Sequence, residues 1–492
     1  MLAMYALRAI LNRQPWSMLA LLVGLTTTTL PVVAAVDEDA LKLHQAWSEL
    51  LGDLNDAEQT LLLEEHFPPA PNERVLADGY RYMLAHLNRE IEELTMRADP
   101  RFPEFFRSVD MLRKWTAENP DAMYLNARID ASGYYEVTIS ARNTEEWRDD
   151  TAQVAGEKAP RLVTFQTITA VPGYTGELQE MATCVSQTLD FTNSFTLQAD
   201  KAGEYKILIG AEKPKGFNGN FLSSRKELKC QATGVTAMAD ASLLSVREIF
   251  SDWENEVPLD MTITRLDAVG ANRRPLNVDQ MAQVIETLGK NVRNQMRFWN
   301  LLMEFPLEMT QDRNGDGRRQ LPVNGINQPA VPFTAAGVAG ARQLYASGIF
   351  DLAEDEALVI KMTTPVEPYY VGFQLSDLWM QGPDQQNFVS SLSGAQNQPA
   401  GDATRYYIIA ATDPGVQGWV DTTGLRLGSH AMRFVFEEDP TEAQLPVLEA
   451  TLVKLDQLGD MLPENYPLVS EVERRQQIAI RQEHIKRRWR NY

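Results

Sequence analysis

The residues best suited to chemistry in this sequence lie in short tracts that combine carboxylates, amides and aromatic rings. Asn119-Pro120-Asp121 is typical of a turn, because proline fixes φ while the Asn and Asp side chains bond to neighbouring backbone groups. Tyr124 stands at the predicted start of a strand, so its hydroxyl is expected near that turn. Hydrogen-bonding groups of this kind orient small polar ligands.

A second tract places opposite charges side by side. Arg247 and Glu248 are neighbours on a predicted strand, so they point to opposite faces and one of them faces inward. An inward arginine needs a carboxylate partner, and Asp252 or Asp421 could supply it.

Tryptophans near these polar groups favour a ligand site. On the rim of a β-sandwich, an aromatic ring beside Asn, Asp and Arg side chains can hold a sugar ring or another small polar ligand. The alternative is that the tryptophans are core residues and the Arg–Asp pairs are structural. The predicted ligand-binding residues are Asn119, Asp121, Tyr124, Arg247, Asp252, Trp253, Trp379, Asp421 and Arg426.

Four tracts together resemble a bacterial family, domain of unknown function 1214, which often occurs with a region numbered 1254. The tracts are 113–115 with 119–124, 247–254, 372–379 and 413–428. The resemblance implies strand-rich sandwich lobes with helical additions, and it implies no agreed reaction. One position departs from the family, where the residue after Thr423-Gly424 is often His. Here it is Leu425, followed by Arg426, so no histidine acid or base is carried over.

The run Asp312-Arg313-Asn314-Gly315-Asp316-Gly317 has the opening of a calcium-binding loop. Oxygen donors at alternate positions, here Asp312, Asn314 and Asp316, and glycine at the sharp turn suit Ca²⁺. The twelfth position of the loop is Val323 where such loops place Glu. The two interpretations are therefore a weak calcium site and a polar turn without metal.

Other cofactors are not expected. The sequence contains no GxSxG elbow, P-loop, HExxH or dinucleotide fingerprint, which speaks against nucleotide and haem cofactors. Its five histidines are too scattered to predict a His-rich zinc site. The net charge of −21 repels phosphate backbones, so nucleic acid is not an expected partner.

The start of the chain has the layout of a secretory signal over residues 1–35. Arg8 and Arg13 precede an uncharged stretch, and Val33-Ala34-Ala35 offers small residues for cleavage. A membrane anchor is the alternative, but the strongly apolar run is short for a spanning helix and no later segment is long enough. A periplasmic or extracellular location is therefore expected.

Export and an even number of cysteines also favour a disulfide between Cys184 and Cys230, with buried free thiols as the alternative.

Hydrophobic periodicity predicts a mainly β protein with helical additions, of the α+β class. Two antiparallel lobes of sandwich or jelly-roll type are expected at 119–270 and 346–440, after a helical N-terminal segment at 36–118. A helix and a turn-rich connection with the calcium loop occupy 271–345, and helices are expected at 441–492. Strands are predicted at 135–140, 161–169, 194–198, 205–210, 243–250, 261–266, 357–360, 369–375, 406–411 and 432–436.

Two functional hypotheses follow from the sequence. The first is a protein that binds a small polar or carbohydrate ligand between the β lobes, with hydrolysis as an open extension. The second is a non-catalytic structural or interaction protein of the cell envelope. A basic C-terminal helix is expected to dock onto the acidic body of the same chain. Clustering of the predicted residues in one pocket favours the first hypothesis, and dispersal over separate cores favours the second.

Overall fold

The structure is a computed structural model of the whole chain. It describes residues 37–62, 73–147, 157–230, 234–312, 315, 319–331, 342–400 and 403–489. The expected signal at 1–35 lies outside the described residues, and so do Asn314 and Asp316 of the predicted calcium loop.

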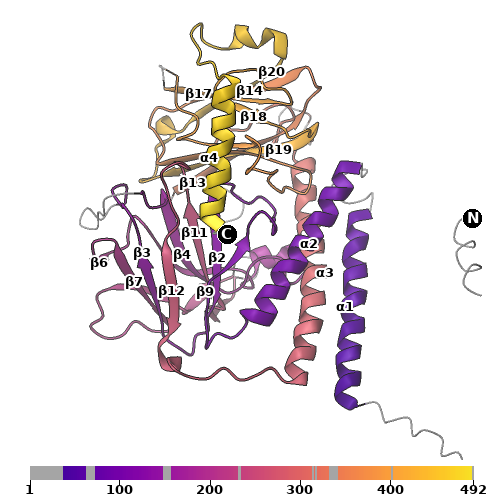
Figure 1. Ribbon diagram of the computed structural model, residues 1–492, viewed down its shortest axis with the longest axis vertical. Helices are drawn as coiled ribbons and strands as arrows, with labels where there is room; N and C mark the ends of the chain where they lie inside the picture. Colours follow the sequence, from indigo (N-terminus) through magenta and orange to yellow (C-terminus); the bar gives the residue numbers. More distant parts are fainter. Residues whose placement is uncertain are drawn as a thin grey trace, which may run out of the picture.

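Three long helices form one side of the molecule (Figure 1). They are α1, Glu38–Leu62, α2, Glu73–Met96, and α3, Val278–Glu308. On α1, Ala46, Leu50, Ala57 and Leu61 are buried at helical spacing, because α1 runs along α3. Gly289 of α3 permits this close approach, since an added Cβ would lie 3.1 Å from the Cα of Leu50.

The first β lobe contains two five-stranded sheets that share one core. The sheet of order β1-β2-β11-β4-β5 comprises Phe106–Val109, Ala122–Arg128, Leu243–Ile249, Leu162–Ile168 and Thr188–Asn193. The other, β12-β3-β7-β6 with β8 beside β7, comprises Asp260–Arg265, Tyr135–Ser140, Glu204–Gly210, Ala199–Lys201 and Asn220–Ser223. A separate ribbon pairs β9, Arg225–Lys229, with β10, Thr236–Asp240. On β3, Tyr135, Val137 and Ile139 are buried in alternation, as the sequence predicts.

The second lobe contains two four-stranded sheets. The order β13-β19-β15-β16 comprises Arg342–Asp351, Leu427–Phe436, Tyr370–Ser376 and Ser391–Ser393. The order β18-β17-β14-β20 comprises Trp419–Asp421, Thr404–Ala410, Glu356–Thr363 and Val447–Lys454. Side chains from both sheets, such as Phe373, Tyr407 and Phe434, fill the core between them. β15 and β17 are buried along their whole length, because both faces of these strands are covered.

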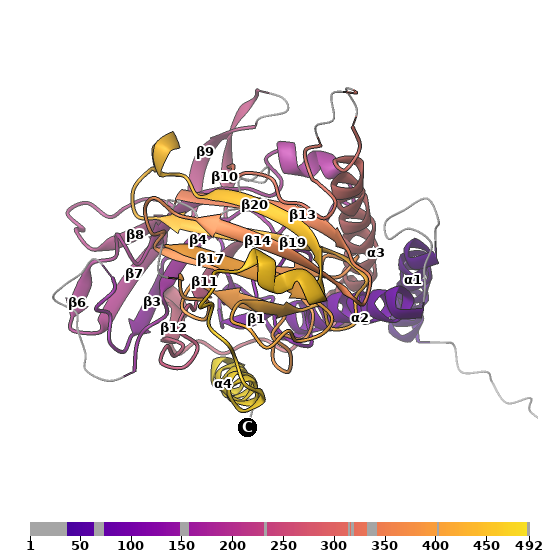
Figure 2. The same cartoon turned by 90° about the horizontal axis from the view of Figure 1, so that it is seen from above.

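The last helix, α4, Glu471–Trp489, lies against both lobes (Figure 1). Viewed from above it is seen nearly end-on, outside the sheets and away from α1 and α2 (Figure 2). This basic helix docks onto its own chain, with Arg474, Arg481 and Arg488 buried. Among the described residues, the acidic surface expected to receive it is present only at Asp413, which pairs with Arg474, because backbone carbonyls receive Arg481 and Arg488. The expected α+β class with two antiparallel lobes and a C-terminal helix is confirmed.

Several predicted elements are wrong. Residues 194–198 form a turn and a connection where a strand was predicted, because the Asn193 side chain accepts the backbone N–H of Phe195. Within 441–492, residues Val447–Lys454 form strand β20, which completes a sheet edge beside β14. Within 36–118, β1 follows the two helices. Tertiary pairing overrides local propensity at both β1 and β20.

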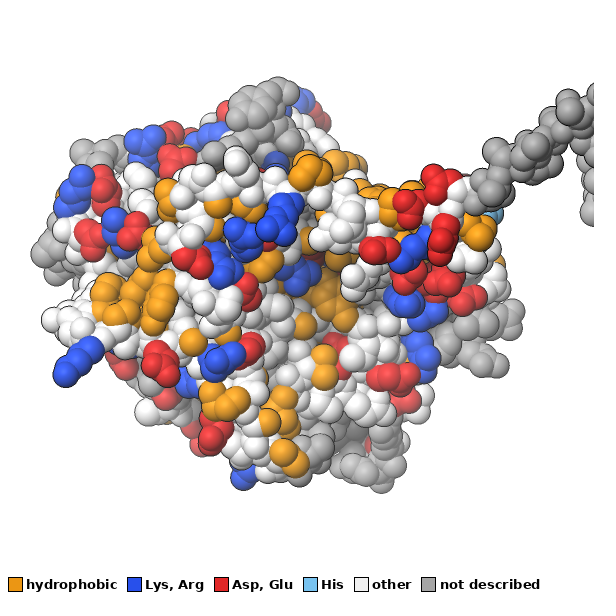
Figure 3. All heavy atoms as spheres, turned by 90° about the horizontal axis from the view of Figure 1, so that it is seen from below, with side chains coloured by type: hydrophobic (Ala, Val, Ile, Leu, Met, Phe, Trp, Pro, Cys, Tyr) orange, Lys and Arg blue, Asp and Glu red, His pale blue; other side chains and the backbone are white. Residues whose placement is uncertain are grey.

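Cys184 and Cys230 form a disulfide, as predicted, with 46 residues of separation. It ties the connection between β4 and β5 to the end of β9. In the part of the chain that the structure describes, no helix is long and apolar enough to cross a bilayer. On the face seen from below, acidic and basic side chains are interspersed without one continuous field of a single sign (Figure 3).

We expect the double variant Cys184→Ser, Cys230→Ser to fold and to lose stability. Closing a loop of this length restricts the unfolded chain by about 3–4 kcal/mol in the chain-entropy account. Urea unfolding of the oxidised, reduced and double-Ser proteins measures the difference. Reduced wild type and the double variant are expected to agree within error. An unchanged midpoint in both would contradict the stabilising role.

Candidate functional site

A hydrogen-bonded network joins the two β lobes around Asp121. The carboxylate of Asp121 accepts the Tyr370 hydroxyl at 2.6 Å and the Trp253 indole N–H at 3.1 Å. The amide of Asn119 donates to the Tyr370 hydroxyl at 3.0 Å, and its oxygen accepts the backbone N–H of Asp121 at 3.0 Å. Asn119, Asp121 and Trp253 belong to the first lobe and Tyr370 begins β15 of the second, so this network crosses the lobe interface.

The turn chemistry predicted for this segment is confirmed. The backbone N–H of Asn119 donates to the Tyr124 hydroxyl at 2.8 Å, which places that hydroxyl at the turn. The guanidinium carbon of Arg247 lies 5.5 Å from the centre of the Tyr124 ring. Of the neighbouring pair on β11, Glu248 is the fully buried member, and its carboxylate accepts the backbone N–H of Leu259.

Asp252 has a local role. Its carboxylate accepts the backbone N–H groups of Glu254 and Asn255, each at 3.2 Å, and the side-chain amide of Asn255 at 2.8 Å. This arrangement caps a turn at the surface.

The network is closed to solvent. Asp121 and Trp253 are each 1% exposed and Asn119 is 6% exposed. Burial raises the pKa of Asp121 to about 6, although the Tyr370 hydrogen bond and the charges of Arg488 and Arg481 favour its ionised form. A ligand reaches this carboxylate only by displacing protein, so the network as it stands is an internal polar core.

Three predicted residues lie away from this network. Trp379 is 1% exposed and donates its indole N–H to the carbonyl of Val75 on α2, within the core that the helices share with the second lobe. Asp421 accepts the backbone N–H of Thr423 at 2.7 Å. Arg426 is exposed and pairs with Asp351 at 3.0 Å. The predicted set therefore divides between the lobe interface and the second lobe.

A polar pocket of about 110 Å³ opens where α2 meets the second lobe. It is flanked by two predicted residues, because Trp379 follows Asp377 in one wall and Asp421 holds Thr423 in another. The residues that line it are Arg74, Asp78, Arg81, Asp377, Gln381, Gly382, Pro383, Asp384, Phe388 and Thr423.

Two residues that line this pocket each carry a buried side-chain oxygen without a partner. Among the described residues, the side-chain oxygen of Gln381 and the hydroxyl of Thr423 have no hydrogen bond. Buried polar atoms are nearly always paired, so such exceptions indicate a missing water or ligand. The atoms offer one acceptor and one hydroxyl, which can donate or accept.

The backbone around the pocket is strained. Thr423 has φ 54° and Met380, next to Gln381, has φ 54°. Ala117, whose N–H donates to the carbonyl of Met380 at 2.8 Å, also has φ 54°. Non-glycine residues in this left-handed region cost roughly 1–3 kcal/mol each and gather at ligand clamps and active sites. Three such residues beside one pocket mark it as a candidate site.

Charges in the pocket are nearly balanced. Arg74 pairs with Asp78 at 2.5 Å, and among the described residues Arg81 pairs with no carboxylate. Burial, and then the charge of Asp78, raise the pKa of Asp377 to about 8. The pocket therefore carries little net negative charge at neutral pH, in a protein whose net charge is −21.

Sequence reasoning did not select Asp377, Gln381 or the arginines of α2. A signal was present, since Arg74, Asp78 and Arg81 recur at helical spacing and share one face of α2. Asp377 and Thr423 lie in two of the tracts that carry the family resemblance, each in the turn after a strand.

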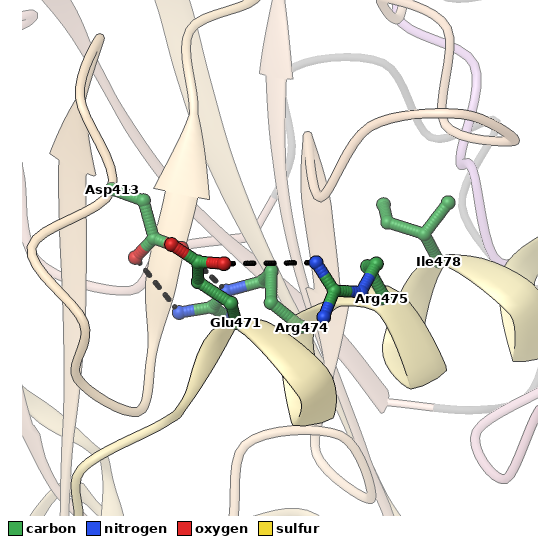
Figure 4. Close-up of a pocket in the computed structure, with 5 residues that line it drawn as sticks. All are labelled: Asp413, Glu471, Arg474, Arg475 and Ile478. Carbon is green, nitrogen blue, oxygen red and sulfur yellow. Dashed lines mark hydrogen bonds and ion pairs between the residues drawn. The ribbon is translucent and has the colours of Figure 1, made fainter.

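A second hollow, of about 330 Å³, lies against the first turns of α4 (Figure 4). Arg474 points to Asp413 and binds it through two nitrogens at 2.9 and 3.1 Å, while Arg475 points to Glu471 at 3.6 Å. Because each arginine already has a carboxylate partner, this hollow is a weaker candidate. The Arg474–Asp413 pair anchors α4 to the second lobe.

The metal prediction stays a prediction. Among the described residues, no group of three or more His, Cys, Asp or Glu side chains is arranged to hold a metal ion. Asp312 is half-buried at the end of the α3 segment, and the other two predicted ligands lie outside the described residues.

A third polar cluster is buried between α2, α3 and the first lobe. Glu90 accepts the amide of Asn291 at 2.7 Å and the Tyr174 hydroxyl at 3.3 Å, and Glu93 pairs with Arg128. Burial, together with the charge of Glu93, raises the pKa of Glu90 to about 7. Because the carboxylates of Glu90 and Glu93 are buried and bonded to neighbouring side chains, we assign this cluster a structural role.

We expect Tyr370→Phe to destabilise the protein by about 1–3 kcal/mol, because it leaves the buried Asp121 carboxylate without its shortest hydrogen bond. Tyr80→Phe is the matched control, since the Tyr80 hydroxyl binds Glu58 at the surface. Chemical denaturation of both variants makes the comparison. Equal, small losses in the two variants would show that the lobe network contributes little.

The raised pKa of Glu90 predicts that the stability of the folded protein depends on pH. The folded protein keeps the Glu90 proton up to about pH 7, and the unfolded chain releases it near the ordinary value of 4.5. Stability contributed by the neutral form is therefore lost as pH rises through that interval. Glu90→Gln removes this loss, so its stability relative to wild type is expected to rise between pH 5 and pH 8, by about 3 kcal/mol at most.

Unfolding midpoints at both pH values test the expectation. Glu254→Gln, at an exposed site, is the control and is expected to show no such trend. A gap between Glu90→Gln and wild type that is the same at pH 5 and pH 8 would rule out the raised pKa.

The fold is shared with a solved structure. The chain is similar to an uncharacterized protein from Burkholderia cenocepacia with a TM-score of 0.66 and 24% identity, over 85% of this chain and 99% of that one. A protein from Vibrio parahaemolyticus matches with a TM-score of 0.36 and 12% identity, over 81% of this chain and 100% of that one. No family model and no curated protein matches the chain, so the resemblance to domain of unknown function 1214 stays a prediction. What the comparison with the Burkholderia cenocepacia protein establishes is the fold.

Proposed function

We propose that the protein binds a small polar ligand in the pocket between α2 and the second lobe. The observation that carries this proposal is that two residues lining one pocket, Gln381 and Thr423, each keep a buried side-chain oxygen without a partner in the described part of the chain. Leaving a buried polar group unpaired costs about 1–3 kcal/mol, and a ligand with hydroxyl groups offsets this cost.

The pocket favours a sugar acid as the class of ligand. Hydroxyl groups suit Gln381 and Thr423, and a carboxylate suits the guanidinium of Arg81. Phe388 lines the same pocket and is 41% exposed, so it offers a ring face to a pyranose. A sugar acid belongs to the class of small polar or carbohydrate ligands expected from the sequence. The proposed pocket differs from the lobe interface where the sequence predicted the site.

The contacts of Asp377 favour ligand binding over hydrolysis as the function of this pocket. Its carboxyl oxygens accept the backbone N–H groups of Trp379 and Gln381, each at 2.9 Å, and the Gln381 amide at 3.0 Å. With these contacts the carboxyl shapes its own loop, and it has little freedom to act on a substrate.

The alternative hypothesis of a structural or interaction protein draws support from the lobe interface, where Asn119, Asp121 and Trp253 are packed away from solvent. For these residues we propose a structural role. We also propose that the protein is exported, which the Cys184–Cys230 disulfide and the signal-like sequence of residues 1–35 support. We also propose that the loop at Asp312 binds calcium and that the ion stabilises the connection that follows α3.

The test is a thermal-shift titration of the protein with glucuronate, glucose and malate. Glucuronate combines hydroxyls, a ring and a carboxylate, so we expect it to raise the melting temperature most. A ligand at 100 times its Kd adds about 2.7 kcal/mol of stability. If none of the three moves the melting temperature, the proposal fails for this class of ligand.

Arg81→Met locates the site. Removing a charged hydrogen-bond donor costs about 1.5–3 kcal/mol, so the affinity for glucuronate is expected to fall by at least tenfold. Arg475→Met removes an exposed arginine elsewhere and serves as the control. Calorimetric titration measures both affinities. Unchanged affinity in Arg81→Met would place the binding outside this pocket.

A further inference from the structure

The indole ring of Trp253 is covered by side chains of α4. The imidazole of His484 stacks on it, with ring centres 4.9 Å apart and planes inclined by 22°. The guanidinium carbon of Arg481 lies 4.6 Å from the indole centre and that of Arg488 lies 5.2 Å from it. Guanidinium groups over a Trp face gain from the ring quadrupole and from their weak hydration.

The acceptors around Arg481 match the shape of its guanidinium group. Its Nε donates to the carbonyl of Gln385 at 2.8 Å, Nη1 donates to the carbonyl of Ser391 at 3.0 Å, and Nη2 donates to the Ser391 hydroxyl at 2.8 Å. Neutral oxygens thus satisfy three positions of a planar donor group, which a lysine ammonium cannot reproduce.

Arg488 reaches the first lobe, where a hydrogen bond and an aromatic face receive its guanidinium group. Its Nη2 donates to the carbonyl of Pro120 at 2.8 Å, and its guanidinium carbon lies 5.4 Å from the centre of the Phe250 ring. The side chain is 1% exposed, and its Nε and Nη1 have no hydrogen-bond partner among the described residues. The charge of Asp121 attracts both Arg481 and Arg488.

Apolar contacts do not explain why α4 docks. Of its apolar side chains only Ile485 and Trp489 are fully buried, while three of its buried residues are arginines. Burying a guanidinium is costly unless its surroundings replace water. The seam therefore has the features of a receptor for guanidinium groups: two aromatic faces, backbone carbonyls and one nearby carboxylate.

We propose that this seam between the lobes is a binding site for guanidinium side chains, and that Arg481 and Arg488 of α4 are its built-in ligands. The class of ligand is an arginine presented by a helix. Binding of these two arginines in the seam holds the lobes together, because Arg488 bonds to Pro120 of the first lobe while Arg481 bonds to Gln385 and Ser391 of the second. This site is separate from the pocket at Asp377.

Chemical rescue of Arg488→Ala in the full chain tests the site. The variant is expected to melt at a lower temperature than wild type. Ethylguanidinium at low millimolar concentration is expected to restore at least half of that loss, because it refills the space between Trp253, Phe250 and Pro120. Propylammonium at the same concentration, which lacks the planar donor group, is expected to restore none. Rescue by neither ion, or equal rescue by both, would overturn the proposal.

Two further variants keep the test decisive. Arg475→Ala removes an exposed arginine of the same helix, and its melting temperature is expected to match wild type with and without ethylguanidinium. Arg488→Lys keeps the charge and loses the planar donors, and it is informative even if Arg488→Ala fails to fold. A melting temperature of Arg488→Lys equal to wild type would show that charge alone suffices and would overturn recognition of the guanidinium group.

Discussion

The hydrogen bonds of the buried Asp121 carboxylate are the constraint on which the joining of the two lobes depends. Asp121 binds Tyr370 of the second lobe and Trp253 of the first, so one buried side chain bonds to both sandwiches. A buried carboxylate is stable only when its oxygens are paired, and this requirement makes the arrangement selective. A sliding of one lobe past the other would leave the charge unsatisfied.

The C-terminal helix completes this interface from outside. Arg481 and Arg488 supply positive charge near Asp121 and cover the ring of Trp253. The sequence led us to expect that a basic helix would dock on acidic surface residues. The structure differs, because backbone carbonyls and aromatic faces receive most of these guanidinium groups. Such partners cost less desolvation than a carboxylate at each position would.

The pocket beside α2 depends on the same architecture. The turn after β15 and the turn after β18 both bond to helix α2, and each is shaped by a local cap, Asp377 in one turn and Asp421 in the other. These caps impose left-handed backbone at Met380 and Thr423. Strain is therefore concentrated where the second lobe and helix α2 meet, and two residues that line the pocket there, Gln381 and Thr423, keep buried side-chain oxygens without partners among the residues described.

The sequence by itself determined the mainly β class, the helical N-terminal segment, the disulfide pairing and the turn at Asn119 with the Tyr124 hydroxyl beside it. These features depend on local chemistry: period-2 and period-3.6 burial, the fixed φ of proline, and a single pairing of two cysteines. Only the tertiary structure decided that Trp253 and Trp379 are core residues and that β20 is a strand. It also decided that Arg74 and Arg81 of α2 line the same pocket as Asp377. Each of these features depends on which segments pack together across a long sequence separation. The spacing of residues along the chain does not show which distant segments pack together.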